Sequence, residues 1–83
     1  LELNDFKSIN LRNLVSVPII AVYNNPTDYP DKYVARLWDI KNKATEYVTV
    51  RDSLEEIRVT IPGYMTRLGA CNMDDPVIVE TWI

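Results

Sequence analysis

The segment YVARLWDI, residues 33–40, alternates between two sets of side chains, as a β-strand with two different faces does. One set contains Ala35 and Leu37, side chains small enough to allow a helix to pack closely against them. The other set contains Arg36 and Trp38 beside aliphatic neighbours. The segment therefore predicts a strand whose first face packs against a helix and whose second face also needs a cover.

The segments on either side of this strand predict a sheet. Residues 17–23, VPIIAVY, form an apolar run that is too short and too β-branched for a helix. Residues 24–32, NNPTDYPDK, combine two prolines with Asn and Asp, which is typical of a loop. Residues 46–50, EYVTV, alternate polar and apolar side chains and suit a hairpin partner. Three consecutive strands of an antiparallel meander are expected.

In residues 51–64, RDSLEEIRVTIPGY, the spacing of the apolar side chains changes from that of a strand to that of a helix. Ser53 and Glu56 have the spacing of a capping box, and the acidic pair that follows Leu54 suits the positive end of a helix dipole. Apolar side chains recur at helical spacing until a Pro-Gly pair ends the run. This pattern predicts a short helix over residues 53–61.

The two ends of the chain complete the expected fold. Residues 77–83, VIVETWI, predict a last strand, and the long connection before it indicates a functional loop or an extra short strand near residues 64–68. Residues 1–15 are expected to form an N-terminal arm or a short helix. The prediction for residues 1–83 is a single α+β domain, with an antiparallel sheet in the order β-β-β-α-β and one helix on one face.

The second face of the sheet raises the question of partners. If the helix packs on Ala35 and Leu37, simple alternation places Trp82 beside Trp38 on the second face. Arg36 and Glu80 would then pair across that face if their strands were neighbours. Two tryptophans on an open face would form an apolar patch of the kind that soluble monomers rarely expose. The expected cover is the N-terminal segment, a second copy in a homodimer, or a different protein partner.

The composition disfavours several classes of function. A net charge of −3 and scattered basic residues argue against nucleic-acid binding. No apolar run reaches the length of a membrane span and no leader pattern is present, so a cytoplasmic location without membrane contact is expected. The chain has no histidine, two glycines and one cysteine, Cys71, whose acidic neighbours disfavour a thiolate. We therefore expect no enzyme activity, no cofactor and no metal.

Two short segments resemble a known family. YVARLWD at residues 33–39 and DSLEEI at residues 52–57 are similar to the strand and helix start of the HicB-like antitoxins of bacteria. The resemblance implies a small sheet with a helix on one side and a domain that binds and neutralises a toxin ribonuclease, often as an oligomer. The chain as a whole also resembles small uncharacterised proteins of bacterial genomes and mobile elements.

These observations favour a non-catalytic protein-interaction domain, antitoxin-like or regulatory. The residues expected to bind the partner are of types enriched at interfaces or lie in loops. They are Arg36, Trp38, Trp82, Glu80, Tyr29, Tyr64 and Arg67. The alternative is a small ligand-binding or carboxylate-based enzyme domain with four aspartates around one cleft, namely Asp28, Asp31, Asp74 and Asp75.

Overall fold

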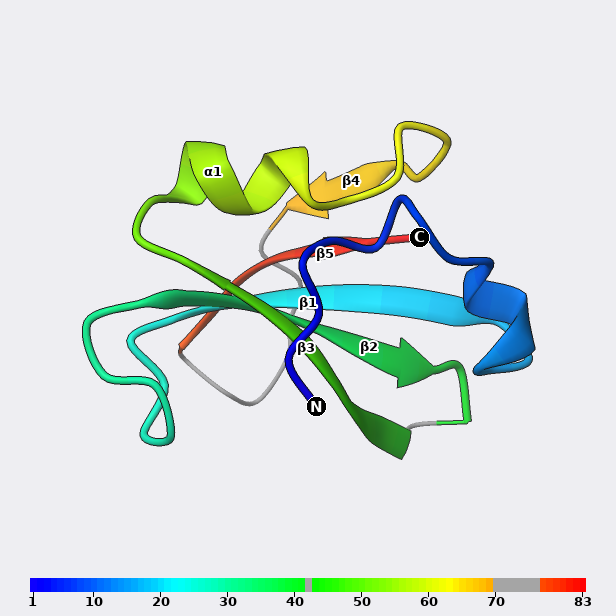
Figure 1. The fold of residues 1–83 in the computed structure, drawn as a ribbon, viewed down its shortest axis with the longest axis horizontal. Coiled ribbons are helices and arrows are strands. Elements are labelled where there is room, and N and C mark those ends of the chain that lie inside the picture. The colour runs from blue at the N-terminus through cyan, green and yellow to red at the C-terminus, as the bar shows by residue number, and fades with distance from the viewer. Residues whose placement is uncertain (42, 70–76) are drawn as a thin grey trace.

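The computed structural model describes residues 1–41, 43–69 and 77–83 as a five-stranded antiparallel sheet with one helix on one face (Figure 1). The elements in chain order are a 3-10 turn η1 (Leu11–Asn13), β1 (Pro18–Asn24), β2 (Tyr33–Asp39), β3 (Lys43–Arg51), α1 (Leu54–Val59), β4 (Arg67–Gly69) and β5 (Ile78–Trp82). The strands lie side by side in the order β3-β2-β1-β5-β4. The predicted α+β class is confirmed. The predicted order β-β-β-α-β lacks β4, which overlaps the extra short strand that was one of the two alternatives near residues 64–68.

The helix α1 begins where the capping pattern predicts. The Glu56 backbone N–H donates to Ser53 Oγ at 3.1 Å, and Ser53 Oγ donates to the Glu56 carboxylate at 3.0 Å. The helix ends at Val59, two residues before the predicted end at residue 61, because its last turn tightens. The Thr60 N–H donates to the carbonyl of Ile57, three residues back. At six residues, α1 is too short to span a membrane, and no other described helix is longer.

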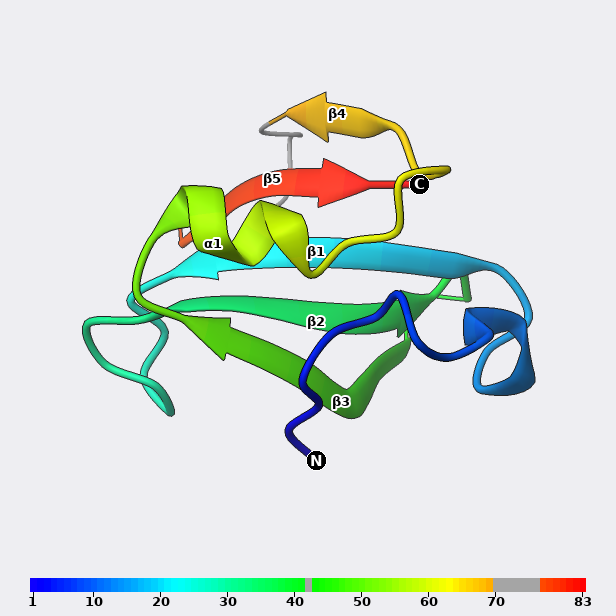
Figure 2. The same cartoon turned by 45° about the horizontal axis from the view of Figure 1, so that its top comes forward.

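The N-terminal arm, residues 1–15, lies on the same face of the sheet as α1 (Figure 2). Its first residues run beside β3, where Val48 N–H donates to Leu1 O at 3.0 Å. Further along, the Phe6 N–H donates to Thr60 O at 2.8 Å, just after α1. Phe6 and Leu11 are fully buried in one cluster with residues of β1, β2 and α1. Of the three possible covers of the second face, the N-terminal segment is therefore ruled out, because the short helix leaves room on the first face and the arm fills it.

A bulge in β5 reverses the expected alternation of side chains. Ile78 and Glu80 pair with consecutive residues of β1, so Val79 is the extra residue of the bulge. Ile78 therefore faces away from α1, whereas Glu80 and Trp82 face towards it. The prediction that Trp82 shares the second face with Trp38 is wrong, since simple alternation does not hold across a bulge.

Candidate functional site

The second face of the sheet, away from α1, is the candidate functional site. The register of the strands places on it side chains from four strands: Ile19, Ala21, Tyr23, Val34, Arg36, Trp38, Val48, Val50, Ile78 and Thr81. Ala21, Val34 and Val48 are buried, whereas Trp38 and Tyr23 remain half-buried. This face therefore combines a buried floor with large side chains that solvent still reaches.

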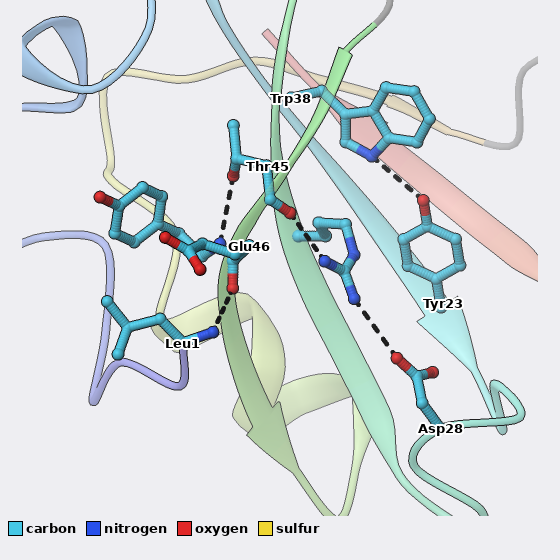
Figure 3. Close-up of polar contacts among 8 residues, drawn as sticks. Leu1, Tyr23, Asp28, Trp38, Thr45 and Glu46 are labelled. Atoms are coloured by element: carbon cyan, nitrogen blue, oxygen red, sulfur yellow. Dashed lines mark hydrogen bonds and ion pairs between the residues drawn. The ribbon is translucent and has the colours of Figure 1, made fainter.

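Trp38 and Tyr23 hold each other in place on the second face (Figure 3). The Trp38 Nε1–H donates to the Tyr23 hydroxyl at 3.1 Å, which joins β2 to the neighbouring strand β1. The bond satisfies the indole N–H, and both rings still present apolar surface. Rings fixed in this way lose little conformational freedom when they meet a partner.

Arg36 lies on the same face, and its guanidinium contacts Thr45 at one end and Asp28 at the other. Its Nη1 donates to the Thr45 carbonyl at 2.7 Å, and Thr45 is itself fixed because its hydroxyl donates to Leu37 O at 2.7 Å. Its Nη2 reaches the Asp28 carboxylate at 3.4 Å, and the Asp28 side chain is 61% exposed. The predicted pairing of Arg36 with Glu80 is wrong, because Glu80 faces the other side of the sheet.

A groove of about 320 Å³ opens between this face and the loop of residues 25–32. Its lining combines aromatic, aliphatic and charged side chains: Tyr23, Pro26, Thr27, Asp28, Val34, Arg36, Ala44 and Val77. The loop brings Asp28 over the sheet, where Arg36 meets it. Among the described residues that line the groove, Arg36 and Asp28 are the charged ones.

Glu80 forms a separate cluster on the α1 side of the sheet. Its buried carboxylate accepts hydrogen bonds from Arg58 Nε at 3.1 Å, Arg58 Nη2 at 2.8 Å and Trp82 Nε1 at 3.1 Å. Arg67 Nη1 lies 3.7 Å from the same carboxylate. Burial acts to raise the pKa of Glu80, but the hydrogen bonds from Arg58 and Trp82 and the charges of both arginines hold it below its ordinary value. This cluster ties α1 to β4 and β5.

The predicted partner-binding residues thus fall into separate groups. Arg36 and Trp38 share the second face. Glu80 lies on the α1 side of the sheet, where Trp82 and Arg67 contact its carboxylate. Tyr29 is half-buried in the loop of residues 25–32, and Tyr64 is exposed after α1. Tyr23 was not among the predicted residues, although its alternation with Ile19 in residues 17–23 places both on one face.

The alternative carboxylate site includes aspartates inside and outside the part of the chain that the structure describes. Asp28 contacts Arg36, whereas Asp74, Asp75 and Cys71 lie outside the described part of the chain. Within residues 1–41, 43–69 and 77–83, no three acidic or cysteine side chains are grouped to hold a metal ion. The carboxylate-based alternative therefore stays a prediction.

A scan against protein-family models, a search of curated proteins and a search of solved structures each found no match. The resemblance to HicB-like antitoxins accordingly stays a prediction.

Proposed function

We propose that this protein is a non-catalytic protein-interaction domain that binds a protein partner through the second face of its sheet. One observation carries the proposal. The arm and α1 cover the first face, whereas Trp38, Tyr23 and Arg36 stay half-buried on the second, where Tyr23 and Arg36 also line a groove. Tryptophan, tyrosine and arginine are the residue types enriched at the energetic centres of protein interfaces.

The contacts of Arg36 suggest how a partner would be recognised. Thr45 fixes one end of the guanidinium, while the other end meets an exposed carboxylate at the long limit of an ion pair. A carboxylate on the partner could share or replace the Asp28 contact without moving the arginine. The bond between Trp38 and Tyr23 holds the apolar part of the surface ready in the same way.

The resemblance to HicB-like antitoxins supplies a first partner to test. In that family the domain neutralises a toxin ribonuclease, so an antitoxin role is one specific form of the proposed interaction. A regulatory partner of another kind would use the same surface. Both forms need an accessible Trp38, and this requirement makes the proposal testable before the partner is known.

Trp38→Glu is expected to abolish capture of the partner. The wild-type chain is used as bait in a bacterial lysate, beside Trp38→Glu and the control Val59→Glu, which adds the same charge at an exposed position of α1. Wild type and the control should retain the same specific protein. With that protein purified, Trp38→Glu should weaken its affinity by about 30-fold or more, the effect of losing an interface hot spot.

Thermal unfolding of all three chains shows whether each variant folds. Retention of the same protein by a folded Trp38→Glu variant would contradict the proposal. Wild-type chain that retains nothing specific, and that also fails to bind a toxin ribonuclease of the kind neutralised by HicB-like antitoxins, would contradict it as well.

A further inference from the structure

A second groove lies at one end of the sheet, where β1 begins, β2 ends and Ile83 follows β5. Its volume is about 350 Å³, near the lower limit of about 300 Å³ for small-molecule sites. We call it the end groove. It borders the second face at Ile19, whereas Trp38 and Tyr23 lie outside its lining. Ligand binding in the end groove therefore does not depend on the proposed protein interface.

Exposed apolar side chains concentrate at the end groove. Four of its lining residues are large hydrophobic residues with much of their surface exposed: Val17 at 45%, Ile40 at 53%, Tyr64 at 73% and Ile83 at 52%. Scattered exposed hydrophobic residues are normal on a soluble protein. Four that line one concave site are typical of a surface that binds an apolar group.

Arg12 gives the end groove its charge. It is exposed in η1 and is the charged residue among the described side chains that line the groove. Within the described part of the chain, its guanidinium makes no hydrogen bond or ion pair. Asp39 lies beyond it, but that carboxylate accepts the Ser16 N–H at 3.3 Å and the Lys41 N–H at 3.4 Å. An unpaired cation beside an apolar groove favours an anionic group on the ligand.

We infer that the end groove binds a small amphiphilic carboxylate, with an aliphatic chain in the groove and the carboxylate on Arg12. The volume suits one aliphatic chain and is too small for a helix or strand of another protein. The Arg12 charge selects a carboxylate over a cationic or neutral head group. The two parts of the ligand thus match the two parts of the site.

Decanoate is the probe that tests this inference. The full chain carries labelled Val and Ile methyl groups and is titrated with decanoate at neutral pH, below the concentration at which it forms micelles. The signals of Val17, Ile40 and Ile83 should shift and saturate. Hexanoate, with less apolar surface, and decyltrimethylammonium, with the opposite charge, should each bind at least about tenfold more weakly.

Two variants locate the site. Arg12→Gln should weaken decanoate about tenfold, the loss of one charged hydrogen bond, and Ile40→Glu should abolish saturable binding. Both side chains are exposed, so both variants should fold. The control Val59→Glu should bind decanoate as the wild type does. Equal affinity for the cationic amphiphile, unchanged affinity in Arg12→Gln, or saturation only at methyl groups outside the end groove would overturn the inference. None of these outcomes alters the Trp38 test.

Discussion

Glu80→Gln is expected to lower the free energy of unfolding by about 2 kcal/mol, the size of effect for losing hydrogen bonds to a buried charged group whose partners stay in contact with solvent. The Glu80 side chain is 3% exposed and accepts hydrogen bonds from Arg58 and Trp82. Glutamine keeps the shape but removes the charge, and Arg58 and Arg67 then face each other without a carboxylate between them. Urea unfolding at neutral pH measures the loss.

The same variant should respond less to acid than the wild type. The pKa of Glu80 is lowered in the folded protein, so its stabilisation is complete above the ordinary glutamate pKa of about 4.3. That stabilisation is lost as the pH falls through the lowered pKa. The difference in stability between wild type and Glu80→Gln should therefore shrink on acidification. Glu46→Gln, the same change at an exposed position, should alter stability by less than about 0.5 kcal/mol.

A stability difference that is absent at neutral pH, or that is unchanged in acid, would contradict the role given to Glu80. Asp5 and Asp39 also have lowered pKa values, because backbone N–H groups of Ser8 and Ser16 donate to their carboxylates. Both aspartates remain in the variant, so the comparison between the two chains isolates the contribution of Glu80.

Phe6→Ala is expected to cost about 4 kcal/mol, within the range for removing a buried aromatic ring. Phe6 is fully buried against the sheet and α1, although it belongs to an arm with little regular structure. Its loss would leave a cavity that the surrounding strands cannot close. For a small domain this is a large part of the total stability. Chemical unfolding monitored by circular dichroism measures the change.

Ile9→Ala is the matched control, because Ile9 lies in the same arm and is exposed. It should cost less than about 1 kcal/mol. If both variants lose the same small amount, the arm does not contribute to the core, and the first face would need another cover.

Local sequence patterns predicted where the strands and the helix lie better than they predicted which side chains lie on each face of the sheet. The Ser53 and Glu56 pair marked the start of α1, and the alternation in residues 33–40 correctly placed Arg36 and Trp38 on one face. Alternation failed in β5 because the bulge at Val79 turns the rest of the strand over. Such a bulge depends on how neighbouring strands pair, which local spacing does not encode.

The arm was only partly predictable, because its structure depends on distant partners. Apolar side chains in residues 3–15 fit a helical stripe, but the backbone there bonds to β3 and to Thr60, and only Leu11–Asn13 turn as a 3-10 helix. The candidate site was likewise found in part. Trp38 follows from alternation, whereas the contact between Asp28 and Arg36 depends on how the loop of residues 25–32 folds over the sheet.

Hydroxyl-radical footprinting of the complex with a captured partner tests the central claim most directly, since it reports which side chains the partner covers. Oxidation of Trp38 and Tyr23 should fall several-fold in the complex, while oxidation of Tyr64, exposed in the end groove, should stay unchanged. Protection of Tyr64 with Trp38 and Tyr23 oxidised as in the free protein would contradict the claim that the second face is the interface.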